Sequence, residues 1–148
     1  MPKVTFVDSG VLIAAATGQP EVASRALEVL DDPDRTFASS DFVRLEVLPK
    51  AIYHRKQHEV DFYEAFFEDV GLWASLTDLL VRRAFDEAKA FGLSATDALH
   101  VAGALSVGAE ELVTTEGSGK PLSRVASVSV RSIRPGDGKA PGDLRANP

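Results

Sequence analysis

Apolar residues along this chain follow two patterns: short continuous runs, and longer segments in which they recur every three or four positions. The continuous runs are β-branched or aromatic and are bounded by polar or turn residues, which is typical of buried strands. They predict strands over residues 4–7, 36–38, 111–114 and 125–133. The helical spacing predicts helices over residues 11–16, 21–30, 41–55, 59–70, 79–91 and 94–107.

Capping and breaking residues indicate where several of these helices begin and end. Ser9 can cap the first helix, and Ser39 or Ser40 can cap the helix that starts at residue 41. Gly92 is expected to end the helix before it in a left-handed conformation. Pro49 lies inside a predicted helix and has no backbone N–H, so we expect a kink or break there.

Strands that alternate with helices predict an α/β fold with a central parallel sheet flanked by helices and right-handed connections. The length of 148 residues fits one domain, which we place over residues 1–134. Residues 135–148 are rich in Gly and Pro, and we expect them to form a disordered tail.

Composition and charge exclude several classes of function. No apolar stretch approaches the about 20 residues that a membrane span needs, and an acid at position 8 stands where a signal peptide would be apolar. We therefore expect a cytoplasmic protein. Cysteine is absent, which excludes disulfides and a thiolate metal site. The net charge of −6 argues against a general nucleic-acid coat but is compatible with acids that hold a metal.

Acidic side chains stand at matching positions around the predicted sheet. Asp8 follows the first strand and Glu116 follows the strand over 111–114. Asp97 lies in the first turn of a helix that returns from the same edge, and Glu46 lies in the second turn of another. Because ligands of parallel α/β sheets bind at the carboxyl ends of the strands, we expect the four acids to meet there.

A cluster of carboxylates needs a cation or protons to remain together. Glu46 falls between apolar Phe42 and Val43 on a helical wheel, where an unpaired carboxylate is costly. Oxygen ligands without Cys or a convincing set of His suit Mg²⁺ or Mn²⁺. Such an ion would lower the pKa of a bound water and stabilise negative charge on a phosphate.

These residues occur in a known combination of motifs. The chain resembles the PIN-domain ribonucleases, the family that includes the VapC-type toxins of type II toxin–antitoxin pairs. The resemblance covers roughly residues 3–133. The motifs that carry it are Phe-Val-Asp-Ser-Gly-Val-Leu-Ile (6–13), Arg-Leu-Glu-Val (44–47), Ser-Ala-Thr-Asp-Ala-Leu-His-Val-Ala (94–102) and Leu-Val-Thr-Thr-Glu (112–116).

The resemblance implies a PIN-like fold and a metal-dependent endoribonuclease that hydrolyses RNA phosphodiester bonds with Mg²⁺ or Mn²⁺. It also implies a homodimer and an antitoxin partner. By motif position, Asp8, Glu46 and Asp97 would be catalytic acids and metal ligands. Ser9 and Thr114 would be supporting polar residues near the site.

Glu116 is the one departure from the family pattern, which usually has Asp at this position. We expect it to serve as the fourth metal ligand and catalytic acid, with a changed geometry because Glu is one methylene longer. The loop over 117–121 also differs from the usual one, and it lacks the first Gly and the final Ser or Thr of a Walker motif. These differences motivate an alternative, a catalytically degenerate module that binds RNA or a protein partner.

Each acid also has a purely structural interpretation. Asp8 can cap a helix, Asp97 completes a Ser-x-x-Asp helix start, and Glu46 can pair with Lys50 one turn later. An aspartyl-phosphate on Asp8 is a further alternative, although Gly10 stands where one class of such enzymes needs a second acid. The presence of all four acids favours the metal site.

Other side chains carry weaker hypotheses. His54 and His58 are four residues apart, but they lack the H-E-x-x-H frame of a zinc site, and the basic run over 54–58 suits solvent or RNA phosphates better. His100 is expected to be packed or hydrogen-bonded. An aromatic-rich segment over 62–73 is expected in the core, with a dimer or antitoxin surface as the alternative.

Overall fold

Five strands of the computed structural model, which describes residues 1–136, form one parallel sheet. The strands are β1 (Lys3–Val7), β2 (Arg35–Ser40), β3 (Leu72–Ala74), β4 (Glu111–Thr114) and β5 (Ser129–Ser132). Their order in the sheet is β3-β2-β1-β4-β5. The chain thus extends the sheet from β1 to one edge and then returns to add strands on the other side. The carboxyl ends of β1 and β4 therefore form a topological switch point, where α/β proteins bind ligands.

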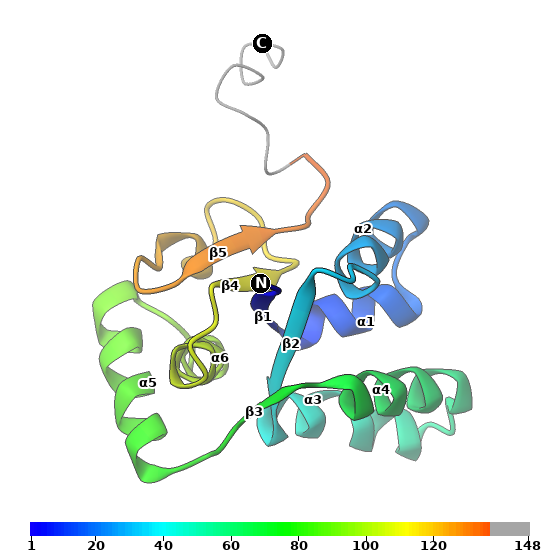
Figure 1. Cartoon of the computed structure of the whole chain (residues 1–148), viewed down its shortest axis with the longest axis horizontal. Helices are drawn as coiled ribbons and strands as arrows, with labels where there is room; N and C mark the ends of the chain where they lie inside the picture. Colours follow the sequence, from blue (N-terminus) through cyan, green and yellow to red (C-terminus); the bar gives the residue numbers. More distant parts are fainter. Residues whose placement is uncertain (137–148) are drawn as a thin grey trace.

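Helices cover both faces of this sheet (Figure 1). They are α1 (Ser9–Thr17), α2 (Pro20–Leu30), α3 (Asp41–Tyr53), α4 (Gln57–Asp69), α5 (Asp78–Phe91) and α6 (Ala95–Ser106), with a short 3₁₀ turn, η1 (Pro121–Arg124). Helix α6 packs across β1, β2, β3 and β4, and α5 covers α6 from outside. Helices α1 to α4 pack together on the opposite face.

The core lies on both sides of the two central strands. Phe6 and Val7 on β1 and Leu112 and Val113 on β4 are all fully buried. These strands read as continuous apolar runs because helices cover both of their faces. Gly103 lets α6 approach β1 closely, since a Cβ there would lie 3.3 Å from the ring of Phe6.

The structure confirms the predicted α/β fold with a parallel sheet flanked by helices. The prediction missed β3, whose three residues carry no distinctive pattern and which forms by pairing with Ala38–Ser40 of β2. The segment over 125–133 does hold a strand, β5, which is confined to Ser129–Ser132 and is preceded by a bend at residues 127–128.

Pro49 does not break its helix, so that part of the prediction was wrong. Helix α3 is continuous through Pro49. The missing N–H leaves the carbonyl of Leu45 without its helical donor, but both residues are exposed and water can replace that bond. Buried Val43 and Val47 hold the helix against the core.

Helix ends agree with the sequence at three sites and differ at one. Ser40 caps α3, Ser94 caps α6, and Gly92 ends α5 with a φ of +67°. Ser9 is not the cap of α1, because it is the first helical residue and Asp8 occupies the cap position. An Asp at the cap accepts the free N–H groups as well as Ser does.

The aromatic segment is partly in the core, as predicted, and partly exposed, while its alternative role as a dimer or antitoxin surface stays a prediction. Tyr63 and Phe66 are buried, while Trp73 is 38% exposed and packs edge-on against Phe67. Within residues 1–136, no helix combines the length and apolar character that crossing a bilayer requires. Residues 137–148, most of the predicted disordered tail, lie outside the described residues.

Candidate metal centre

Asp8 lies directly after β1 and caps α1. Its Oδ1 accepts a hydrogen bond from the backbone N–H of Val11 at 3.2 Å, and its Oδ2 accepts one from the hydroxyl of Thr114 at 2.5 Å. Only 7% of the residue is exposed. The capping interpretation of Asp8 is therefore correct, but it involves one oxygen only. The other oxygen points toward the end of β4.

The hydroxyl of Thr114 connects Asp8 with the loop that carries Glu116. Its Oγ1 accepts a hydrogen bond from the backbone N–H of Glu116 at 3.0 Å, so its own proton is directed to Asp8. Thr114 is 1% exposed, so its bond to Asp8 is shielded from water, whereas the bond from the N–H of Glu116 is only part-buried. Thr114 therefore fixes the ends of two neighbouring strands relative to one another.

Asp97 approaches the same edge from the start of α6. It lies in the first turn, where Ser94 caps the helix by accepting the backbone N–H of Asp97 at 3.1 Å. The positive end of the helix dipole favours a carboxylate at this position. Asp97 is half-buried, so solvent reaches part of it.

Glu46 lies in the second turn of α3 and faces a histidine. Its side chain is 25% exposed, and its Oε1 is 2.8 Å from Nε2 of His100 on α6. The two atoms are within ion-pair distance but lack the alignment of a hydrogen bond. Within residues 1–136, Glu46 makes no ion pair with Lys50, the partner that the sequence suggested.

Glu116 lies in the loop between β4 and η1. Its carboxylate accepts a backbone hydrogen bond from Leu122, a buried residue of η1. Its Oε2 is buried and has no hydrogen-bond partner within residues 1–136. The loop over 117–121 therefore brings the backbone N–H of Leu122, the residue after it, within reach of the Glu116 side chain.

The four acids are electrostatically coupled. Burial raises the pKa of Asp8 above its ordinary value of 3.8, and Asp97 raises it further, while hydrogen bonds and His100 lower it in part. Burial and the charge of Glu46 raise the pKa of Asp97. Burial raises the pKa of Glu116, and so do Asp97 and Asp8. The four acids that the sequence predicted to meet therefore lie close enough to interact electrostatically, and their roles as metal ligands and catalytic acids stay predictions.

The chemistry of these side chains fits a hard divalent cation. The candidate ligands are all carboxylates, and Oε2 of Glu116 is buried without a hydrogen bond to the described residues, while Oε1 of Glu46 faces His100. The raised pKa values of Asp8, Asp97 and Glu116 mean that these three acids bind protons more readily than usual, and a cation would displace those protons. However, the described residues contain no group of three side chains spaced to hold an ion. The four carboxylates therefore lie near one another, but no three of them are placed to bind the same ion.

Gly10 is a residue of this site whose role the sequence analysis missed. A Cβ at this position would lie 2.5 Å from Oγ1 of Thr115 and 3.3 Å from Oδ1 of Asp8. The signal was the Asp-Ser-Gly sequence itself, because a Gly next to a functional acid often marks a close approach. Ser9 is half-buried at the start of α1, and its predicted supporting role stays a prediction.

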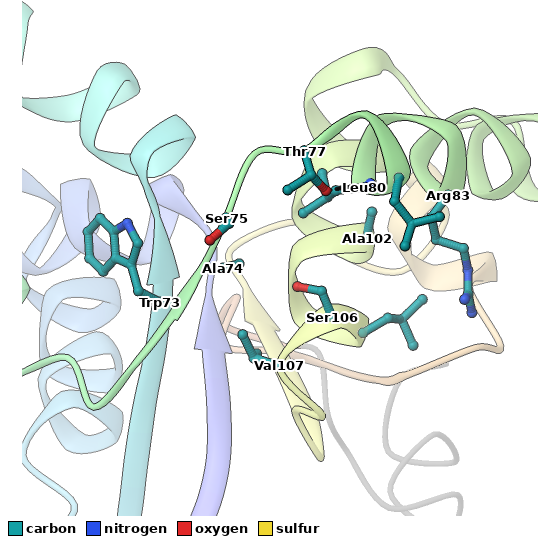
Figure 2. A pocket seen from close by; sticks show the side chains of 11 residues that line it. Trp73, Ala74, Ser75, Thr77, Leu80, Arg83, Ala102, Ser106 and Val107 are labelled. Carbon is teal, nitrogen blue, oxygen red and sulfur yellow. Dashed lines mark hydrogen bonds between the residues drawn. The ribbon is translucent and has the colours of Figure 1, made fainter.

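The surface has one hollow that includes an acid of the site and another that lies away from all four acids. One, of about 180 Å³, extends from Glu46 along α3 to Lys50 and His54. The other, of about 390 Å³, lies between β3 and helices α5 and α6 (Figure 2). Trp73 and Leu80 are among its lining residues, and it contains none of the four acids.

Comparisons with known proteins agree with this architecture. The family model described as PIN domain matches residues 5–127. No curated protein matches the sequence.

Several solved structures share the fold. A VapBC2 structure from Rickettsia felis, bound to a DNA fragment from its promoter, has a TM-score of 0.66 and 16% identity, and the match covers 87% of this chain and 98% of that one. A toxin–antitoxin complex from Klebsiella pneumoniae has a TM-score of 0.65 and 18% identity, with 87% and 97% covered. VapC20 of Mycobacterium tuberculosis, described as a sarcin-ricin loop cleaving toxin, has a TM-score of 0.61 and 16% identity, with 82% and 96% covered. At these identities the likeness shows the fold alone.

Proposed function

We propose, given that this chain belongs to the PIN-domain family, that it is a metal-dependent endoribonuclease which hydrolyses RNA phosphodiester bonds. The observation that carries the proposal is the electrostatic coupling of Asp8, Glu46, Asp97 and Glu116 near the switch point of the sheet, with a buried oxygen of Glu116 that lacks a hydrogen bond within residues 1–136. Metal-binding nuclease chemistry explains why a fold would keep four mutually repelling acids together.

The structural neighbours support a more specific role. One of them is described as a toxin that cleaves the sarcin-ricin loop, which is RNA, and others are toxin–antitoxin complexes. By this analogy, the protein is the cytoplasmic toxin of a toxin–antitoxin pair, acts on RNA, forms a homodimer and binds an antitoxin.

The four carboxylates would hold Mg²⁺ or Mn²⁺ at the carboxyl ends of β1 and β4. The bound ion would supply a water of lowered pKa and stabilise the charge that develops on the phosphate. Asp8 is oriented for this by Thr114 and by the backbone of α1, and Asp97 is oriented by the start of α6.

Glu116 is suited to the proton transfer of the reaction. Its pKa is raised by burial and by Asp97 and Asp8, and its Oε2 has no hydrogen bond within residues 1–136. This oxygen can accept the proton of a water whose oxygen bonds to phosphorus, and the same proton can then pass to the RNA oxygen that leaves as its P–O bond breaks.

Cleavage of a single-stranded RNA tests the proposal. The wild-type protein should cleave in Mn²⁺, and Asp97→Asn should reduce the rate by about 100-fold or more, the range for losing a positioned acid or base. Asp86→Asn is the matched control, since Asp86 is exposed on α5. Equal cleavage by wild type and Asp97→Asn would identify a contaminating nuclease and refute the assignment.

A second candidate is a non-catalytic PIN-like module that binds RNA or a protein partner. It is favoured by the absence of a ready three-ligand set among residues 1–136 and by Glu116 with its unusual loop. It predicts binding without metal-stimulated cleavage. A Mn²⁺-induced rise in melting temperature that disappears in Asp8→Asn would count against it.

A further inference from the structure

His100 is a buried polar side chain that lies next to Glu46 and interacts electrostatically with Asp8 and Asp97. It lies on α6, one turn after Asp97, and is 2% exposed. The rings of Phe6 and Phe42 pack against its imidazole at centroid distances of 6.0 and 5.5 Å. These rings restrict how the imidazole can turn.

The imidazole meets one carboxylate directly. Nε2 of His100 is 2.8 Å from Oε1 of Glu46, an ion-pair distance without the alignment of a hydrogen bond, and neither atom has a hydrogen-bond partner within residues 1–136. Nδ1 of His100 is also buried without a hydrogen-bond partner among these residues. A histidine kept only for packing would serve no better here than an apolar side chain, because its buried nitrogens carry a desolvation cost.

We propose that His100 is a positioning residue that holds the Glu46 carboxylate toward the metal site, an inference that rests on the metal-binding role proposed above. The 2.8 Å separation lets His100, with its proton on Nε2, donate to Oε1 of Glu46 after a small rotation of the carboxylate, which leaves the other carboxylate oxygen for the cation. The two aromatic rings hold the imidazole in place, and the imidazole in turn holds the Glu46 side chain. Because α6 carries both His100 and Asp97, it links the positions of Glu46 and Asp97. Groups of this kind, which hold a metal ligand without touching the metal, affect affinity strongly.

Affinity for Mn²⁺, measured by the loss of the free-ion signal in electron paramagnetic resonance, tests this role without an activity assay. His100→Met fills the space but removes the donor, and it should weaken Mn²⁺ binding by about 10- to 100-fold. His100→Gln places an amide nitrogen the same number of bonds from Cβ as Nε2, so its affinity should stay within about 3-fold of wild type. His58→Gln, at an exposed position of α4, is the matched control and should leave affinity unchanged.

A double-mutant cycle separates positioning from general disruption. If His100 acts through Glu46, His100→Met should cause no further loss of affinity in a Glu46→Gln background. If His100→Met does not fold, as judged by circular dichroism, His100→Asn replaces it, because its amide ends one bond short of Glu46. An undiminished loss in the Glu46→Gln background overturns the proposal.

RNA cleavage, measured separately, distinguishes this inference from the proposed function. Mn²⁺ binding with the expected order of variants but no cleavage of RNA leaves the positioning role standing and refutes the nuclease. If the wild type cleaves RNA and His100→Met binds Mn²⁺ normally, the nuclease stands and the positioning role is refuted. A wild-type protein that binds no Mn²⁺ overturns both.

Discussion

Removal of the Thr114 hydroxyl should destabilise the metal-free protein in a manner that depends on pH. Thr114→Val keeps the β-branched shape, which suits the end of β4, but deletes the donor to Asp8 and the acceptor for the N–H of Glu116. A hydrogen bond to a charged group contributes about 1.5–3 kcal/mol to stability, and an unpaired N–H costs about 1–3 kcal/mol when fully buried.

The net magnitude follows from the burial of each group. Thr114 is 1% exposed, so the bond to Asp8 is lost without replacement by water, whereas the N–H of Glu116 is only part-buried and contributes at the low end. The added methyl group recovers up to about 0.8 kcal/mol of hydrophobic burial. We therefore expect a loss of about 2–3 kcal/mol in the free energy of unfolding at pH 7.5.

The pH dependence follows from Asp8. Its folded pKa is raised above 3.8, so the stability that it contributes is present at low pH and is lost as pH rises through the folded pKa. Thr114 limits this rise in pKa by stabilising the ionised form, and without it the pKa rises further. The difference between wild type and Thr114→Val should therefore grow with pH. At about pH 4.5 a larger share of Asp8 is neutral than at pH 7.5, so the difference should shrink toward about 1 kcal/mol, the value for a neutral hydrogen bond.

Urea denaturation at the two pH values, with a chelator present, measures these differences. Thr36→Val on β2 is the matched control, because this half-buried threonine makes no side-chain hydrogen bond within residues 1–136. Its loss should be below about 0.5 kcal/mol at both pH values. The reasoning would be refuted by a Thr114→Val loss that is the same at both pH values or no larger than that of Thr36→Val.

Three further changes test other parts of the structure. Asp8→Asn should raise the melting temperature of the metal-free protein at pH 7.5, because it removes a buried charge repelled by its neighbours, and should abolish the rise caused by Mn²⁺. Gly10→Ala should cost about 1–3 kcal/mol in urea denaturation and slow RNA cleavage, because its Cβ would displace Thr115 and Asp8. Arg35→Met should cost about 3 kcal/mol, because the nearly buried carboxylate of Glu111 loses its partner at 2.8 Å and keeps only the half-exposed Lys3 at 3.9 Å, yet it should leave Mn²⁺ affinity unchanged.

Controls separate these effects from general damage. Gly108→Ala places a methyl group in open space at a φ of +67°, so it should cost about 1 kcal/mol and leave cleavage unchanged. A metal-free Asp8→Asn protein that melts below wild type would contradict the charge argument. Weaker Mn²⁺ binding in Arg35→Met would mean that the far edge of the sheet also shapes the site.

The sequence by itself determined the buried strands and the ends of several helices, because these depend on residues close together in the chain. The apolar runs of β1 and β4 predicted buried central strands, and Ser40, Gly92 and Ser94 marked helix ends that the structure confirms. The convergence of the acids also followed from sequence, since topology alone places residues after parallel strands at one edge. No long-range contact had to be known for these inferences, because strand pattern, caps and parallel topology are properties of short segments.

Tertiary structure decided what depends on partners far away along the chain. β3 exists because β2 offers it a pairing edge, and α3 continues through Pro49 because its buried side holds it. The bond from Thr114 to Asp8 joins residues 106 positions apart, and the contact between His100 and Glu46 joins two different helices. A sequence shows which residues can donate, accept or ionise, whereas burial and pairing are set by the whole chain at once, and these raise the pKa values that suit the site for a cation.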